Sequence, residues 1–188
     1  LAVLRGLDEL QERRALFEAV WNAPLPRDRG LDLLGMIDAA AAGRLKALII
    51  VGYDILPTLA DLTATRAALA KLELVIVLDL FLNETAVQFA HVVLPAASAF
   101  EKDGTFMNAE RRVQRVRAAV SPPGEAWPDW RIIAGLARHM GRAAGFEFDS
   151  AESIWNEIRS VWPEGRGITY PRLDSGGLQW PCRDDADP

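Results

Sequence analysis

Cysteine and histidine are scarce in this sequence. Its 188 residues include one cysteine, Cys182, and two histidines, His91 and His139, which lie far apart. A single cysteine excludes a disulfide framework and a CxxC metal site within the chain, and the two histidines show no metal-ligand spacing. The cysteine and histidine content therefore predicts no metal site within this chain.

Long hydrophobic runs and an excess of positive charge are also lacking. No apolar run approaches the roughly 18 residues that suggest a membrane-spanning helix, so we expect no membrane span. The net charge is -5, which argues against nucleic-acid binding because that function favours a basic surface. The first residues, "LAVLRGLDELQERR", are amphipathic and charged and do not resemble a signal peptide, so we expect a cytoplasmic location.

Apolar residues are plentiful, at 50% of the chain, which is enough for a globular domain with a proper core. Because the sequence starts at Leu1 and not at Met, we expect it to be a piece of a longer protein. Some segments repeat apolar residues at helical spacing, and others are short continuous apolar runs. Helices are predicted at about residues 6–22, 31–42, 58–72, 84–90, 128–141 and 150–162, and strands at 46–52, 72–79 and 91–95.

The predicted strands and helices alternate along the chain, as they do in βαβ units. Continuous apolar strands suit a sheet that is buried on both faces. We therefore predict an α/β fold, a Rossmann-like three-layer αβα domain with a mainly parallel sheet. This domain is expected to span residues 1–145, and residues 146–188 to add a helix and an irregular tail without a core of its own.

Ligands of such sheets bind at the carboxyl ends of the strands, which are followed here by segments 52–54, 79–86 and 95–108. None of them contains GxGxxG or GxxxxGKS/T, so an ordinary NAD site or P-loop is not supported. The third segment runs into "EKDGTFMNAERRVQRVR", a polar, arginine-rich loop. A glycine in such a turn suggests a positive φ or a close approach to a ligand, and we expect one of these at Gly104.

The longest specific pattern begins at this edge of the predicted sheet. An E-T-A segment is followed by V-L-P, by "EKDGTFMNAERR", and by "PGEAWPDW". This string, within a likeness that covers roughly residues 15–182, closely resembles the molybdopterin oxidoreductase family. The sequence looks most like the catalytic subunit of the formate dehydrogenases in that family.

The resemblance implies a molybdenum or tungsten enzyme with a bis-molybdopterin guanine dinucleotide cofactor. It implies that this chain holds one pterin guanine dinucleotide, and that the iron–sulfur clusters and the metal-ligating cysteine or selenocysteine lie elsewhere in the subunit. The expected partners are the remaining domains of the same subunit and electron-transfer subunits. The 188 residues by themselves are expected to be inactive.

Four residues occupy positions that would contact the cofactor by similarity. They are Asp54, Asp79, Lys102 and Asp129. A guanine edge presents neighbouring N–H donors that suit a carboxylate, and a pyrophosphate requires cations and backbone N–H groups. The sequence departs from the family pattern at "GYDI", where many members have G-E-N-P, so Ile55 replaces a proline.

Each of these residues also has a plainer interpretation. Asp54 and Asp79 follow apolar strands, where an aspartate can cap a turn or a helix. Asp129 starts a predicted helix, where the helix dipole favours an acid, and Lys102 suits a solvated surface. We expect Glu110, Arg111 and Arg112 to form structural ion pairs that pin the loop to a neighbouring domain, rather than to act directly in catalysis.

Two other functions stay open beside formate oxidation to carbon dioxide. The first is that of an assimilatory nitrate reductase, which by resemblance shares the fold and cofactor but transfers an oxygen atom. The second is a non-catalytic scaffold domain, as in the large subunit of respiratory NADH dehydrogenase. The presence of Asp79, Lys102 and Asp129 counts against a domain that has lost its cofactor.

Overall fold

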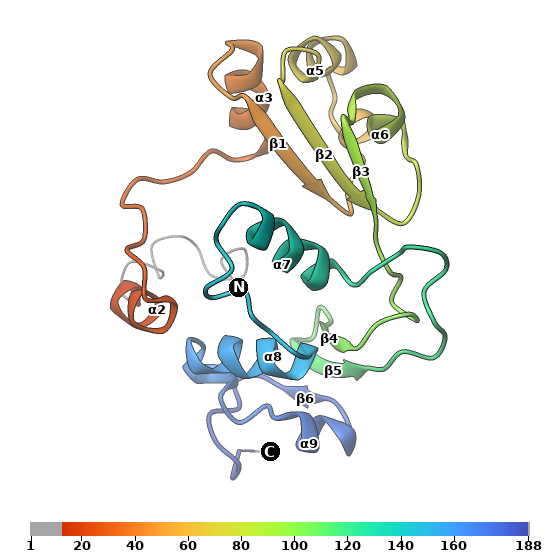
Figure 1. Ribbon diagram of the computed structural model, residues 1–188. Coiled ribbons are helices and arrows are strands. Elements are labelled where there is room, and N and C mark those ends of the chain that lie inside the picture. Colours follow the sequence, from red (N-terminus) through yellow and green to blue (C-terminus); the bar gives the residue numbers. More distant parts are fainter. Residues whose placement is uncertain (1–12, 188) are drawn as a thin grey trace. The chain divides into compact units, whose positions relative to one another are not determined.

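The computed structural model describes residues 13–187, which form two compact units (Figure 1). Unit 2 consists of Gly30–Ser98 and Pro122–Ile132, and unit 1 of the remaining segments. These units do not coincide with the predicted boundary at residue 145, because Ala99–Ser121 groups with the C-terminal residues.

Unit 2 is built on a three-stranded parallel sheet. Its strands are β1 (Ala47–Val51), β2 (Leu74–Asp79) and β3 (Val92–Pro95), in the order β1-β2-β3. All three lie within the segments predicted as strands. The α/β fold with a parallel sheet is therefore confirmed, and β2 is its central strand.

Three of the helices of unit 2 begin at a short polar side chain, Asp32, Asp61 or Asn83, which accepts from a backbone N–H of the first turn. The helices of this unit are α3 (Leu33–Ala41), α4 (Ile55–Thr58), α5 (Leu62–Leu69) and α6 (Glu84–Phe89). The single helix predicted at 58–72 is wrong at its start. The chain is extended at Leu59, and Asp61 then caps α5 by accepting from the N–H of Ala64 at 2.8 Å.

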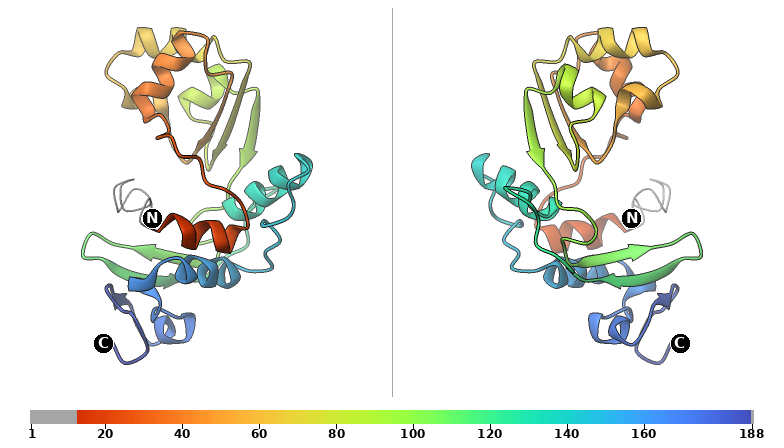
Figure 2. Two further views of the ribbon diagram at one scale, coloured as in Figure 1. Left: turned by 90° about the vertical axis from the view of Figure 1, so that its left-hand side faces the viewer. Right: turned by 90° about the vertical axis from the view of Figure 1, so that its right-hand side faces the viewer.

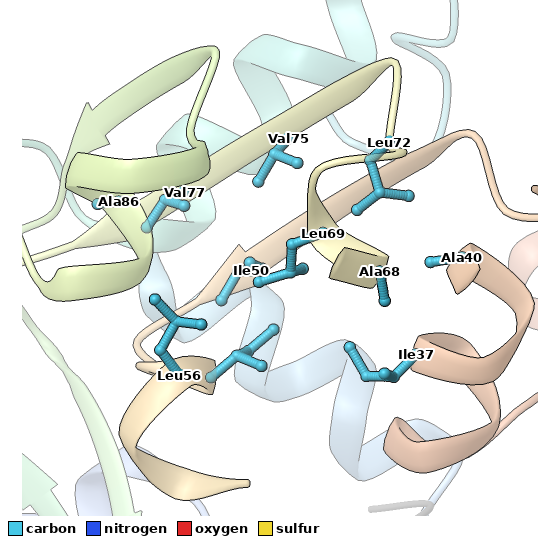
Figure 3. Packing of buried hydrophobic residues seen from close by; sticks show 11 residues of the cluster. Ile37, Ala40, Ile50, Leu56, Ala68, Leu69, Leu72, Val75, Val77 and Ala86 are labelled. Atoms are coloured by element: carbon cyan, nitrogen blue, oxygen red, sulfur yellow. The ribbon is translucent and has the colours of Figure 1, made fainter. Parts of the chain in front are cut away.

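The core of unit 2 lies between these helices and one face of the sheet (Figure 3). Ile50, Val75 and Val77 project from that face and pack against buried side chains of all four helices. Those helical side chains are Ile37, Ala40, Ile55, Leu56, Ala68, Leu69 and Ala86. Side chains alternate between the two faces of a strand, and several aliphatic residues of the opposite face are exposed.

Unit 1 contains a small antiparallel sheet, which corrects the prediction of an irregular loop at 101–117. β4 (Gly104–Met107) pairs with β5 (Arg112–Val116), and β5 pairs with β6 (Leu178–Gln179). Figure 2 shows the β4–β5 ribbon lying beside α8 (Ala151–Ser160). The polar segment is thus a hairpin.

The turn of this hairpin does not depend on Gly104. The φ of Gly104 is not positive, and no atom lies within 4 Å of the position that a Cβ would take. The expectation of a positive φ at Gly104 is therefore wrong, whereas the alternative, a close backbone approach to a ligand, stays a prediction. The positive φ, 64°, belongs to Arg111, and the side chain of Asn108 accepts from the backbone N–H groups of Glu110 and Arg112 at 3.0 Å.

The C-terminal residues carry a core of their own, contrary to the prediction of an irregular tail. After α8 come a 3-10 turn, η1 (Pro163–Gly165), and α9 (Tyr170–Asp174). Their buried side chains form one cluster with the hairpin: Val113, Trp155, Trp162, Ile168, Tyr170, Leu173 and Cys182. Two further helices are α2 (Arg14–Trp21) and α7 (Asp129–His139). Residues 6–12 of the predicted first helix lie outside the described residues.

Candidate functional site

The carboxyl ends of β1, β2 and β3 lie at one edge of the parallel sheet, as expected for a ligand-binding edge. Asp79 is the last residue of the central strand. Asp54 follows β1 and directly precedes α4. Both carboxylates bind residues at the start of α6, so the structure brings these two predicted site residues to a common element.

Asp79 is partly buried and only partly engaged by the protein. Its Oδ1 accepts from the N–H of Leu80 at 2.6 Å, and its Oδ2 accepts from the side-chain amide of Asn83 at 2.8 Å. The oxygen of the same amide caps α6 by accepting from the N–H of Ala86. A carboxylate can accept about four hydrogen bonds, so Asp79, at the end of β2, keeps acceptor capacity.

Asp54 is more fully engaged. Its Oδ1 accepts from the N–H of Thr85 at 3.1 Å and from the hydroxyl of Thr85 at 2.5 Å, and its Oδ2 accepts from the N–H of Glu84 at 3.2 Å. Asp54 is the residue before α4, yet its side chain caps α6 instead. These contacts match the plainer, structural interpretation of Asp54.

Thr85 is a site-forming residue that the sequence reasoning did not single out. It is fully buried, and its hydroxyl accepts from the N–H of Leu56 at 3.0 Å while it donates to Asp54. This hydroxyl therefore joins the loop after β1 to the start of α6. The signal for it in the sequence is the E-T-A segment of the family pattern.

Asp129 lies near the end of β3, because a short backbone pairing holds Trp127 beside the residues that end and follow this strand. The N–H of Trp127 donates to the carbonyl of Pro95 at 3.1 Å, and the N–H of Ala97 donates to the carbonyl of Trp127 at 2.8 Å. Asp129, two residues later, is the first residue of α7 and is partly buried. The "PDW" segment thus adjoins the carboxyl edge of the sheet.

Lys102 lies in unit 1, just before β4, and is partly buried. Beyond it, Arg111 and Arg112 of the hairpin make structural contacts within unit 1, and these contacts are not the expected ion pairs to a neighbouring domain. Arg112 donates to the carbonyl of Gly177 at 2.8 Å, and the guanidinium of Arg111 lies 5.1 Å from the ring centre of Trp180. The carbonyl of Glu110 accepts from the side chain of Gln179 at 2.7 Å.

The loop that follows Asp79 is apolar and exposed. Leu80, Phe81 and Leu82 have exposed fractions of 49%, 77% and 70%, although soluble surfaces seldom gather such side chains without a partner. Residues 13–187 contain no group of three or more histidine, cysteine or acidic side chains that could hold a metal ion. In the same range, no helix is long and apolar enough to cross a membrane.

The sequence matches known proteins along most of its length. The model of the molybdopterin oxidoreductase family matches residues 17–139. The alpha subunit of an F420-dependent formate dehydrogenase from Methanocaldococcus jannaschii is 45% identical over 183 residues. Formate dehydrogenase H from Escherichia coli is 39% identical over 176 residues.

Both alignments cover nearly all of the chain but little of the relatives. The match covers 97% of this chain and 27% of the Methanocaldococcus protein, and 93% of this chain and 24% of the Escherichia protein. Among solved structures, acetylene hydratase from Pelobacter acetylenicus has a TM-score of 0.66 at 20% identity over 92% of this chain and 24% of that one. At that identity the likeness supports the fold alone. The chain spans about a quarter of the length of these proteins.

Proposed function

This chain belongs to the molybdopterin oxidoreductase family, and from that we propose that it is part of the catalytic subunit of a formate dehydrogenase. In the whole enzyme formate is oxidised to carbon dioxide. The role of these 188 residues is to hold one pterin guanine dinucleotide of a molybdenum or tungsten cofactor. Bound, this cofactor supplies the redox-active metal.

The observation that carries this proposal is the acceptor capacity of Asp79. Its carboxylate ends the central strand and receives only two hydrogen bonds from the described residues that surround it. The guanine edge offers N1–H and N2–H₂ side by side, and a carboxylate accepts both in charge-assisted bonds. We therefore assign Asp79 to guanine recognition, with Asn83 fixing the orientation of the carboxylate.

The other predicted residues have separate roles in this proposal. Lys102 supplies positive charge for the pyrophosphate, for which a lysine is a suitable point charge. Asp129 contributes a further acceptor beside the end of β3. Asp54 acts mainly by positioning, because three hydrogen bonds already tie its carboxylate to α6.

The remainder of the enzyme lies outside the 188 residues in this proposal. Iron–sulfur clusters and the metal-ligating residue belong to other parts of the same subunit, and electrons leave through partner subunits. The support is that the relatives are alpha subunits about four times as long as this chain. No catalytic side chain is assigned within the chain.

The test is Asp79→Asn in the full-length subunit. The substitution replaces an acceptor by an amide donor that faces the donors of guanine. Losing a hydrogen bond to a charged group costs about 1.5–3 kcal/mol, which weakens binding by roughly tenfold to a hundredfold. We expect the metal content and the GMP released by acid hydrolysis to fall together after gel filtration.

Asn83→Ser is the matched control, because it removes the internal donor to Asp79 and keeps a good helix cap. Retained cofactor in this variant would show that a loosened loop does not explain the loss in Asp79→Asn. Unchanged metal and GMP contents in Asp79→Asn would refute the assignment. A parent subunit with neither metal nor GMP would favour the scaffold function instead.

A further inference from the structure

Helix α7 and the residues that end it expose one face on which every charged side chain is basic. Its members lie three or four residues apart, the spacing that places side chains on one side of a helix. We call it the arginine face: Arg131, Gly135, Arg138, His139 and Arg142. The four basic residues are exposed, whereas Ile132, Ala134 and Ala137 on the other side of α7 are buried.

The cations of the arginine face form no ion pair within residues 13–187. Arg131 lies 5.3 Å from the ring centre of Trp130, which carries no charge. Elsewhere in the chain arginines pair with acids: Arg13 with Glu164, Arg66 with Glu84 and Arg117 with Asp174. The chain has 26 acidic and 21 basic residues, so a shortage of carboxylates does not explain the unpaired arginines.

The position of Arg131 is unfavourable for the helix by itself. α7 begins at Asp129, so Arg131 lies in the first turn, where the positive end of the helix dipole disfavours a cation. The same dipole favours Arg138 and His139 in the last turn. The dipole therefore accounts for the basic residues at the end of α7 and not for Arg131.

Gly135, at the centre of the arginine face, is a second unfavourable choice. It lies inside α7, where glycine destabilises a helix relative to alanine. No atom lies within 4 Å of the position that a Cβ would take, so no packing among the described residues requires a glycine here. Between the basic side chains it leaves open backbone that another chain can approach closely.

We propose that the arginine face docks an acidic segment of a partner subunit, which presents aspartate or glutamate side chains to these cations. The inference rests on the proposed function, in which electrons leave through partner subunits. Two of the relatives are named as alpha subunits. Arginine binds carboxylates through paired N–H donors, and such a segment offsets both the unpaired charges and the position of Arg131.

The composition of the arginine face favours a contact between separate chains. It contains no large apolar side chain, whereas permanent interfaces are more hydrophobic. Complementary charge steers the encounter of separate chains. The net charge of -5 argues against a nucleic acid as the occupant.

The first test uses the enzyme complex purified at low salt through a tag on the full-length subunit. Arg138→Glu reverses one charge of the arginine face, and Arg44→Glu is the matched control, because Arg44 is also exposed and forms no ion pair within the described part of the chain. We expect R138E to bind the partner subunit about tenfold more weakly or worse, and R44E to bind it like the parent. Gly135→Ala should also weaken binding, although the substitution favours the helix.

The second test identifies the occupant by Arg138→Lys and Arg44→Lys. A carbodiimide joins the new amine to an adjoining carboxylate, and mass spectrometry identifies the peptide that is attached. We expect R138K to cross-link to an acidic peptide of a partner subunit, and R44K not to. A cross-link to the same subunit or to a second copy, or no cross-link, would overturn the proposal. Equal partner binding by R138E and R44E, or a parent subunit that retains no partner, would do the same.

Metal and GMP contents are measured in the same samples. Loss of the partner from R138E with both contents unchanged supports the arginine face, and this holds even where Asp79→Asn fails to lower them. Loss of the cofactor together with the partner in R138E would refute a docking role, because the substitution would then act through the fold or the cofactor site.

Discussion

Thr85→Val removes one hydroxyl from the buried junction between Asp54, Leu56 and α6 and leaves a side chain of nearly the same shape. The hydroxyl makes two hydrogen bonds, as donor to the Asp54 carboxylate at 2.5 Å and as acceptor from the N–H of Leu56 at 3.0 Å. Thr85 is fully buried and Leu56 is 1% exposed, so water cannot replace the lost partner.

The expected cost follows from these two bonds. A hydrogen bond to a charged group contributes about 1.5–3 kcal/mol, and a buried N–H left without a partner costs about 1–3 kcal/mol. Asp54 keeps two N–H donors, so the lower end of the first range applies. We expect the free energy of unfolding to fall by about 3 kcal/mol.

Thr65→Val is the matched control for this substitution. Thr65 is also buried, but its hydroxyl donates only to the carbonyl of Asp61, which also accepts from the N–H of Thr65. Its removal leaves no N–H group unpaired, so we expect a loss of about 1 kcal/mol or less. Urea denaturation of both variants and the parent, followed by circular dichroism, gives the two differences. A loss in Thr85→Val no larger than in Thr65→Val would refute the junction as a source of stability.

Two further predictions concern unit 1 and α7. Burial raises the pKa of Tyr170 above the usual 10.0, with the nearby Arg115 acting in the opposite direction. The folded chain therefore holds the Tyr170 proton more tightly than the unfolded chain does. This contribution to the free energy of unfolding is fully present below pH 10 and is lost as the pH rises through the pKa of the folded state. Absorbance at alkaline pH in a Tyr53→Phe background measures the titration, and a Tyr170 pKa at the usual value would contradict the prediction. Gly165→Ala would place a methyl group 2.2 Å from the ring of Trp162 and should lower the free energy of unfolding by about 1–3 kcal/mol. Gly135→Ala, in open space within α7, should raise it by about 0.5–1 kcal/mol; thermal unfolding compares the two, and equal effects would refute the packing argument.

Much of unit 2 was determined by the sequence alone. Continuous apolar runs located β1, β2 and β3 to within about two residues, because a strand in a parallel sheet needs apolar side chains on both faces. The family pattern also marks Asp79, and the position of this residue at the end of a strand follows from the local order of residues along the chain.

Unit 1 was predicted less well because its structure depends on contacts between distant residues. The segment 101–117 has the polarity of a loop, yet β4 and β5 within it pair as a hairpin, and β5 also pairs with β6, more than 60 residues later in the chain. The tail after residue 163 is rich in glycine and proline, which hides the fact that Trp162, Ile168 and Tyr170 meet in one cluster.

The same division holds for the candidate site. The sequence by itself determined which residue types follow each strand, since strand ends and turn residues are local features. Only the tertiary structure decided how each carboxylate is used: Asp54 is tied to Thr85, 31 residues away, whereas Asp79 keeps acceptor capacity.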